Sequence, residues 1–278
     1  MFCFSDMSGL DRIERVIVVL SGKGGVGKST IAAQLALSLY ARGNRVGLLD
    51  VDLCGPSIPR MFGVDKSTPA NTVYETDAGM TPVSVFGSST FKLMSMAFLL
   101  DNDSDAVVWR GPRKMSMIQR LLTGVNWGEL DYLIIDTPPG TSDEHITVMT
   151  VLKQHERAAN FLRAVLVTTP QMLSINDVRR EITFCQKTSF RMIGLIENMS
   201  GYVCPHCSEC TNIFASGGGR LLADQYAIPF LGQLPIDNQL NAILDQGVQQ
   251  VDNGLEMIMK TETAKLFSPL LDSIVEHW

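Results

Sequence analysis

Short runs of apolar, β-branched residues recur along the chain, and stretches with helical spacing lie between them. The runs are Val16 to Leu20, Arg45 to Leu49, Tyr132 to Ile135, Ala164 to Thr168, Ile193 to Ile196 and Ile228 to Leu231. Continuous apolar strands that alternate with helices are typical of a parallel sheet covered on both faces. The pattern therefore predicts a three-layer α/β fold with a mostly parallel central sheet and helices on each side.

Turn and capping residues predict where some helices begin and end. Gly43 and Asn44 follow an amphipathic stretch over residues 31–40, so we expect the first helix to end there. Ser174 and Asp177 have the spacing of a capping pair before a helix that runs to about Lys187.

Two further segments have a distinct pattern. Residues 68–96 contain possible short strands around Val83 and Leu93, which suggests an antiparallel excursion at a sheet edge. The last stretch, Leu266 to Trp278, has helical spacing but carries Asp272 and Glu276 on its polar face. Membrane-surface helices usually carry Lys or Arg there. We therefore expect a terminal helix that docks on the core.

Nothing in the sequence divides the chain into separate domains. No stretch is rich enough in Pro, Gly or Ser to act as a linker, and a chain of 278 residues fits one α/β domain. We expect a single domain over 1–278, with residues 1–14 as an N-terminal tail and residues 199–219 as a cysteine-bearing loop.

Composition and charge exclude several classes of function. The net charge of -6 argues against a sequence-independent nucleic-acid binder, which needs a clustered basic surface. No apolar run approaches the ~18 residues of a membrane span, and the N-terminus lacks the features of a signal peptide. The 6 cysteines therefore suggest reduced thiols or metal ligands in a cytosolic protein.

A glycine-rich loop joins the first predicted strand to the first predicted helix. It has the spacing G-x-x-x-x-G-K-[ST], in which backbone N–H groups cradle phosphates and the lysine neutralises the β and γ oxygens. The predicted nucleotide-binding residues are Gly22, Lys23, Gly24, Gly25, Val26, Gly27, Lys28, Ser29 and Thr30. We expect Ser29 to ligate Mg²⁺, and the helix N-terminus adds its positive dipole end.

Aspartates follow two more of the predicted strands. Asp50 and Asp52 end the second strand, and Asp136 ends the strand L-D-Y-L-I-I-D, an arrangement of the Walker B type. Ligands of open parallel sheets bind beyond the carboxyl ends of the strands, so these carboxylates are expected to face the phosphates. Asp136 is the expected Mg²⁺ residue, and residues 137–140 are the expected switch that senses the γ-phosphate.

The sequence indicates the base of the nucleotide less specifically than it indicates the phosphate site. The chain has no N-K-x-D motif of the kind that guanine-specific P-loop proteins use, which favours ATP. Asn198 follows a predicted strand, and its amide can both donate and accept, so we take it as the candidate for the base edge.

Three cysteines lie within seven residues, at Cys204, Cys207 and Cys210, a spacing that suits a metal. A closed zinc site needs four ligands, and His206 lies between two of the cysteines, so one chain would reach that number only with strained geometry. In a dimer, Cys204 and Cys207 of each chain would supply the four thiolates of a [4Fe-4S] cluster. Zinc remains the alternative. Cys54 and Cys185 are expected to be buried.

The chain resembles the Mrp/NUBP family of iron-sulfur cluster scaffold ATPases from about Arg15 to the C-terminus. Four segments carry this resemblance. They are D-V-D-L-C-G-P-S-I-P-R, V-V-W-R-G-P, D-T-P-P-G-T-S-D-E-H and E-N-M-S-G-Y-V-C-P-H-C-S-E-C. The last resembles most closely the smaller of two eukaryotic subunits, whose larger partner carries an additional N-terminal four-cysteine segment.

The resemblance implies a role for several residues. In the deviant Walker A class, which this glycine loop also resembles, the extra lysine, here Lys23, reaches across a dimer interface to the partner's phosphates. The second aspartate of D-x-D, here Asp52, orients the attacking water. The family's bridging ligands correspond to Cys204 and Cys207, whereas Cys210 has no assigned role.

The implied activity is that of a cytosolic ATPase that assembles a labile [4Fe-4S] cluster. It would pair with the larger subunit in a heterotetramer, or with itself in a homodimer, and would pass the cluster to apoproteins. Two alternatives are a partition-type ATPase that moves on membrane or DNA, and a metallochaperone that inserts nickel or zinc.

Overall fold

The computed structural model describes residues 9–52, 55–100, 111–155, 157–203, 210–211 and 217–278. The strands are β1 (Ile13–Ser21), β2 (Val46–Asp50), β3 (Glu75–Thr76), β4 (Gly79–Met80), β5 (Val83–Ser84), β6 (Phe91–Ser95), β7 (Leu130–Asp136), β8 (Leu162–Thr168), β9 (Met192–Glu197), β10 (Tyr202–Val203), β11 (Cys210–Thr211) and β12 (Phe230–Gln233). The α-helices are α1 (Lys28–Ala41), α2 (Ile58–Phe62), α3 (Gly111–Thr123), α4 (Asp143–Lys153), α5 (Ala158–Phe161), α6 (Met172–Lys187), α7 (Gly218–Gln225), α8 (Asn238–Gln246), α9 (Gly254–Lys260) and α10 (Glu262–Glu276).

Eight of the described strands form one sheet in the order β12-β9-β8-β1-β7-β2-β6-β5. Neighbouring strands from β12 to β6 run parallel, and β5 pairs antiparallel with β6. The central strands are buried on both faces, which is why their sequences are continuous apolar runs. The predicted mostly parallel α/β sheet is confirmed.

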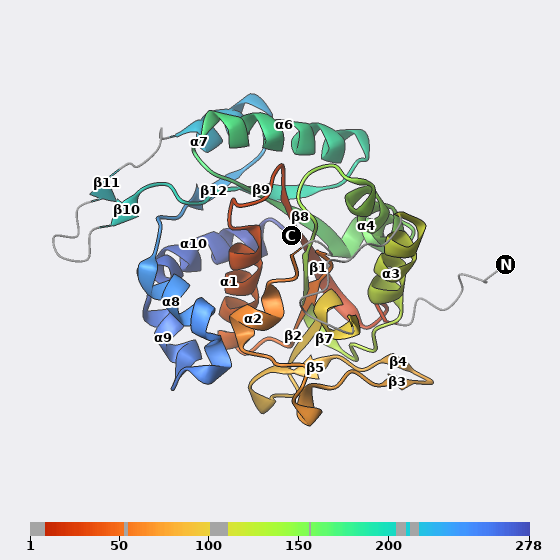
Figure 1. The fold of residues 1–278 in the computed structure, drawn as a ribbon. Helices are drawn as coiled ribbons and strands as arrows, with labels where there is room; N and C mark the ends of the chain where they lie inside the picture. The colour runs from red at the N-terminus through yellow and green to blue at the C-terminus, as the bar shows by residue number, and fades with distance from the viewer. Residues whose placement is uncertain (1–8, 53–54, 101–110, 156, 204–209, 212–216) are drawn as a thin grey trace.

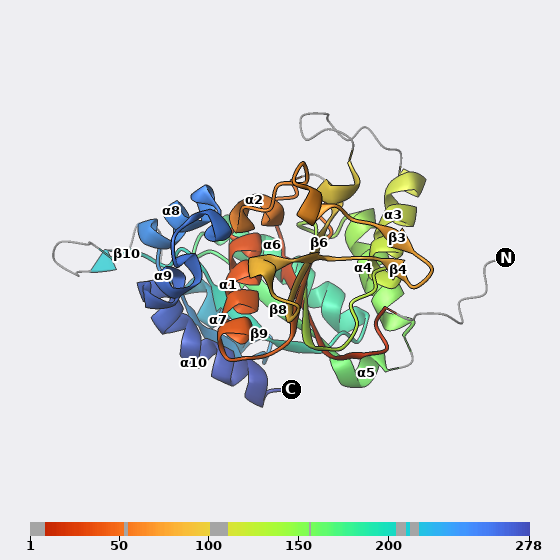
Figure 2. The same ribbon diagram turned by 90° about the horizontal axis from the view of Figure 1, so that it is seen from below.

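Helices cover both faces of the sheet (Figures 1 and 2). One layer contains α1, α2, α8, α9 and α10, and the opposite layer contains α3, α4, α5, α6 and α7. Alternate side chains of β1 enter two separate cores: Ile17 and Val19 pack in one, and Val16, Val18 and Leu20 pack in the other. The two cores place β1 at the centre of the molecule, and the loop that follows it leaves the carboxyl edge of the sheet.

The excursion predicted over residues 68–96 is present but is only partly antiparallel. Val83 pairs antiparallel with Leu93, as expected. However, β6 also pairs in parallel with β2, so the strand around Leu93 belongs to the main sheet. The short strands β3 and β4 form a separate antiparallel ribbon beside it.

Two predicted boundaries were wrong. The last strand begins at Phe230, because Ala227 has a positive φ of 52° and the Ile228 N–H still bonds the Ala223 carbonyl at the end of α7. The capping pair of Ser174 and Asp177 does not form. Helix α6 already begins at Met172, and the buried Ser174 hydroxyl instead accepts a hydrogen bond from Thr169 at 2.6 Å.

The C-terminal helix α10 docks on the sheet through one face, as its spacing predicts. Phe267, Leu271 and Ile274 are fully buried in the core shared with α1, whereas Leu266 is 42% exposed. In the described part of the chain, no helix combines the length and the apolar character that crossing a membrane requires.

This docking predicts a contrast between two leucines of the same helix. Leu271→Ala should lower the free energy of unfolding by about 2–5 kcal/mol, because it leaves a cavity in the core. Leu266→Ala removes the same atoms from a partly exposed site and should cost much less. Chemical denaturation of both variants checks this, and equal losses would contradict the core-docking role of α10.

Candidate nucleotide site

The register of the sheet brings polar side chains together at its carboxyl edge. Asp50 at the end of β2 lies opposite Asp136 of β7 on one side and Ser95 of β6 on the other. Asp136 in turn lies opposite Val19 of β1, two residues before the strand ends at Ser21. The glycine loop therefore leaves β1 directly beside both aspartates.

The glycine loop has the backbone conformation of a phosphate cradle. Gly25 and Gly27 have positive φ angles of 77° and 82°, which favour glycine. A side chain at Gly25 would meet no atom within 4 Å, so the mouth of the loop is open. Helix α1 begins at Lys28 with no side-chain cap and no acidic residue in its first turn. Its first N–H groups are therefore available to an anion.

Two other glycines set how closely neighbouring elements approach the loop. A Cβ at Gly22 would lie 2.2 Å from the backbone carbonyl carbon of Asp177, so α6 packs directly against the loop. The Gly140 N–H donates to the Ser21 carbonyl at 2.8 Å, and Gly140 has a φ of 74°. The predicted switch thus lies against the glycine loop, with the Thr137 hydroxyl bonded to the Val19 carbonyl at 2.8 Å.

Lys28 and Asp136 form a buried ion pair. The ammonium of Lys28 lies 2.5 Å from Asp136 Oδ1, and the two side chains are 6% and 0% exposed. The second oxygen, Oδ2, is also buried and has no hydrogen-bond partner among the described residues. An unpaired buried oxygen is costly, so Asp136 retains an acceptor for a further ligand.

Asp50 is a second fully buried carboxylate beside this pair. It accepts hydrogen bonds from the Asp52 N–H at 3.1 Å, from the Ser95 hydroxyl at 3.1 Å and from the Ile58 N–H at 3.4 Å. Burial raises the pKa of the Asp50 carboxyl well above its ordinary value, and the charge of Asp136 raises this pKa further, although Lys28 lowers it.

These groups fit a divalent cation. Two buried carboxylates face the single positive charge of Lys28, and one carboxylate oxygen has no partner in the described structure. Magnesium prefers oxygen ligands and binds through one or two carboxylates together with substrate phosphates. Ser29, in the first turn of α1, is half-buried and belongs to the same loop.

The other predicted residues of the glycine loop and of D-x-D lie at the same edge. Asp52 is half-buried and follows Asp50, and its negative charge contributes to the raised pKa of Asp50. Lys23 is half-buried, and its ammonium makes no hydrogen bond or ion pair with the described residues. Gly24 is exposed, and a Cβ placed on it would lie 3.9 Å from Pro139 Cγ. Val26 is buried in the core, and Thr30 lies in the first turn of α1.

Asn198 contacts the glycine loop itself. Its side-chain Nδ2 donates to the Val26 carbonyl at 2.9 Å, and its backbone N–H donates to the Thr168 carbonyl at 2.8 Å. A Cβ at Gly27 would lie 2.2 Å from Nδ2. Asn198 therefore braces the loop in this structure, and its contact with a base stays a prediction.

Cys204 and Cys207 lie outside the described residues, as do Cys3 and Cys54. The strands that flank the first pair are described: Val203 of β10 pairs antiparallel with Cys210 of β11. Cys185 on α6 is fully buried, as predicted, and burial raises its pKa.

Sequence reasoning missed two residues of this edge. Ser95 carries no motif, and its contact with Asp50 appears only through the pairing of β6 with β2. Glu197 precedes Asn198 in the quoted motif and proves to be a fully buried carboxylate at the end of β9. A charged residue that ends an apolar strand was the signal that could have revealed it.

The fold and this edge define a P-loop NTPase: a glycine loop opens a helix, and strand-end aspartates lie beside its lysine. The family model of the ParA group described as NUBPL iron-transfer P-loop NTPase matches residues 12–274, and the chain belongs to this family.

Named relatives agree with this assignment. The chain is 56% identical over 243 residues to a cytosolic Fe-S cluster assembly factor NUBP2 of Gallus gallus, which covers 87% of this chain and 86% of that protein. It is 54% identical over 245 residues to a NUBP2 homolog of Nematostella vectensis, with 88% of each chain covered. The cytosolic localisation predicted from the sequence agrees with these names.

Solved structures show the same fold. A nucleotide-binding protein from Archaeoglobus fulgidus in complex with ADP has a TM-score of 0.73 and 39% identity, and the match covers 90% of this chain and 94% of that one. MinD of Pyrococcus horikoshii, complexed with Mg-ADP, has a TM-score of 0.65 at 21% identity, over 93% of this chain and 94% of its own. The second likeness concerns the fold alone.

The open cradle predicts a contrast between two glycines that have similar backbones. Gly25→Ala places a methyl group in the mouth of the loop and should greatly weaken nucleotide binding. Gly43 has a φ of 86°, and a Cβ placed on it would also meet no atom within 4 Å. It lies after α1 and away from the site, so Gly43→Ala is the matched control. Both should cost about 1 kcal/mol of stability for the backbone, and nucleotide titration should separate them. Equal nucleotide affinities would contradict the assignment of the cradle.

Proposed function

We propose that this protein is a cytosolic scaffold ATPase that assembles a labile [4Fe-4S] cluster and transfers it to apoproteins. The observation that carries the proposal is the contact between the P-loop and the strand that leads into the cysteine-bearing segment. Asn198 bonds the P-loop carbonyl of Val26, and Cys204 and Cys207 follow six and nine residues later. The names of the relatives, Fe-S cluster assembly factors, support the nature of the cargo.

The P-loop side of the proposal is ATP hydrolysis. Water attacks the γ-phosphorus, the bond to the β–γ bridging oxygen breaks, and ADP leaves with that oxygen and its electron pair. Lys28 neutralises the developing charge on the β and γ oxygens. To reach these oxygens, its ammonium breaks the ion pair with Asp136. Asp52 orients the water from a position two residues beyond the end of β2. Residues 137–140 sense the γ-phosphate through the hydrogen bond between Gly140 and Ser21.

Asp136 and Ser29 are the residues that would hold Mg²⁺. When bound, the ion would add positive charge beside the transferred phosphoryl group. The unpaired Oδ2 of Asp136 supports this assignment. The Oδ1 oxygen is available to it once Lys28 turns to the phosphates.

The proposed assembly is a dimer with nucleotide at its seam. Lys23 is half-buried, and its ammonium makes no hydrogen bond or ion pair with the described residues, so it is available to a partner's phosphates. The cluster is the cargo of this dimer, held by Cys204 and Cys207 of each chain. The larger NUBP-type subunit is the proposed partner, in a heterotetramer, and a homodimer uses the same seam.

Asp52→Asn tests the hydrolysis step. The amide keeps the size of the side chain but loses the charge that orients water, so ATP hydrolysis should fall by about 10²-fold or more while ATP affinity stays near the wild-type value. Radiolabelled phosphate release and equilibrium binding measure the two quantities. Loss of binding together with hydrolysis would assign Asp52 to Mg²⁺ or to folding. Lys28→Ala is a poorer test, because it would leave the buried Asp136 without its counter-charge.

Alanine substitutions of the cysteines test whether the cargo is a cluster shared by two chains. Cys204→Ala or Cys207→Ala should each remove the cluster and weaken the cluster-bridged dimer, whereas Cys210→Ala should have a distinctly smaller effect. Iron, acid-labile sulfide and mass by light scattering should be measured anaerobically, alone and with the larger subunit. About four irons per dimer are expected. One tightly held zinc per monomer, insensitive to dilution, would instead indicate a closed structural site.

A further inference from the structure

Glu197 ties together the two ends of the cysteine-bearing segment. It is the last residue of β9 and is fully buried. The Ser200 hydroxyl donates to its Oε1 at 2.6 Å, and the Gly219 N–H donates to its Oε2 at 2.6 Å. Residues 201–218 lie between these two donors and contain Cys204, Cys207 and Cys210. One carboxylate therefore anchors both ends of the segment.

The contact with Gly219 is also a helix cap. Gly219 lies in the first turn of α7, whose N-cap residue Gly217 supplies no side-chain hydrogen bond. A carboxylate at this position satisfies a free N–H and lies at the positive end of the helix dipole. A Cβ at Gly219 would be 2.9 Å from Glu197 Oε2, so glycine permits the close approach.

The chemistry of this anchor exceeds what packing alone requires. Both donors to Glu197 are neutral groups, and burying a carboxylate is costly unless its oxygens are well bonded. An apolar residue in place of Glu197 could be buried at the end of β9 without the cost of burying a carboxylate. The charge therefore points to a role in positioning the segment.

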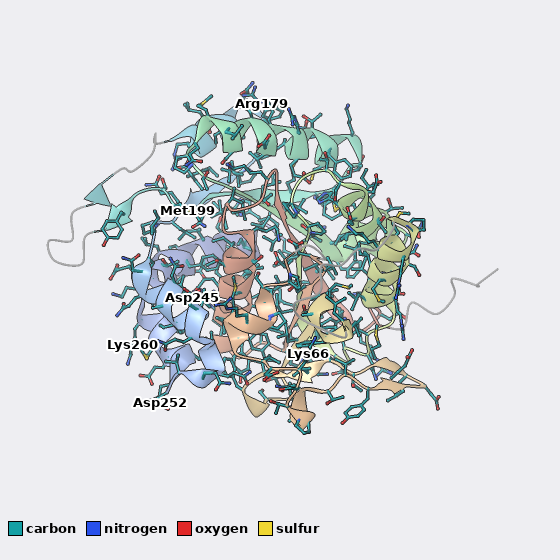
Figure 3. The ribbon with its side chains drawn as sticks, in the orientation of Figure 1. Lys66, Arg179, Met199, Asp245, Asp252 and Lys260 are labelled. Carbon is teal, nitrogen blue, oxygen red and sulfur yellow. The ribbon has the colours of Figure 1, made fainter. Side chains whose placement is uncertain are left out.

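The residues that follow Glu197 contact the nucleotide loop. Asn198 donates to the Val26 carbonyl at 2.9 Å. Met199 has a φ of 56°, a strained conformation for a residue with a side chain, and its Cε would lie 3.6 Å from a Cβ placed on Gly27. Figure 3 shows Met199 between the start of α1 and the chain that leads to β10. Two consecutive residues thus connect the two regions: Asn198 bonds the P-loop, and Glu197 bonds both ends of the cysteine-bearing segment.

We infer that Glu197 is a positioning residue that couples the nucleotide state of the P-loop to the cysteines. A nucleotide that shifts the peptide between Val26 and Gly27 moves Asn198, and with it the end of β9. Because both ends of the segment bond the same carboxylate, they move together. The inference rests on the proposed function only in treating Cys204 and Cys207 as the cargo thiols.

The test measures thiol reactivity in the metal-free protein, so that it does not depend on cluster formation. Alkylation rates of Cys204 and Cys207 by iodoacetamide are followed by mass spectrometry, with and without Mg-ATP, in the full chain. The variants are Glu197→Ala, which removes both acceptors, and Glu197→Gln, which can still accept from Gly219 and donate to Ser200. Glu181→Ala is the control, since Glu181 is equally buried but faces His145 on α4.

In the wild type, Mg-ATP should change the alkylation rates by about fivefold or more, the lower end of coupling between two sites. Glu197→Ala should bind ATP with little change in affinity but lose most of this response. Glu197→Gln should restore it, and Glu181→Ala should keep it despite lost stability. A merely structural role would not separate the ATP response from ATP affinity in this way.

Two results would overturn the inference. One is a wild-type protein in which Mg-ATP leaves the alkylation rates of Cys204 and Cys207 unchanged, and the other is a Glu197→Ala variant that keeps the full wild-type response. If Glu197→Ala does not fold, Ser200→Ala decides, because it removes one of the two bonds; an undiminished response in that variant counts against the coupling. A protein that binds no iron or sulfide would refute the proposed cargo, yet the thiol measurement would still test the coupling.

Discussion

The structure depends on how buried negative charge is balanced at the carboxyl edge of the sheet. Asp50 and Asp136 lie side by side on adjacent strands, and Lys28 neutralises part of their charge from the first turn of α1. Burial keeps the pKa of Asp50 high, and one oxygen of Asp136 has no partner among the described residues. In the function that we propose, a cation and phosphates would complete this arrangement, and the ligand would then take part in balancing the buried charge of the core.

The surrounding packing holds this edge in position. Two cores on opposite faces of the sheet bury β1 from Val16 to its end at Ser21, so the glycine loop starts from a strand that is packed on both faces. Gly22 lets α6 approach the loop, and Gly140 joins the predicted switch to the end of β1. Changes at the phosphates therefore have direct contacts through which to reach α6 and the residues before α4.

The end of β9 connects this nucleotide edge with the segment that carries the cysteines. Asn198 bonds the P-loop, and Glu197 bonds both ends of that segment. In a protein that binds nucleotide and carries a metal cargo, such a connection provides a physical route for coupling the two. The route is short because β9 lies next to β8, which in turn pairs with β1.

The sequence by itself determined the fold class, the P-loop and the strand-end aspartates. Continuous apolar runs, without alternating polar residues, indicate parallel strands that are buried on both faces. The glycines and Lys28 lie close together in the chain, so their spacing can be recognised from the sequence alone. Local patterns were less reliable at boundaries. Ser174 looked like a cap, but its hydroxyl is tied to Thr169 across a turn, and the exposed Met172 and Leu173 already belong to α6.

Only the tertiary structure decided which distant residues meet. The pairing of β6 with β2 placed Ser95 on Asp50, and the return of the chain at α7 placed Gly219 on Glu197. These contacts join residues 45 and 22 positions apart, respectively. Hydrogen bonds of this kind depend on strand order and register, which are set by packing over the whole sheet, and no short stretch of sequence records them.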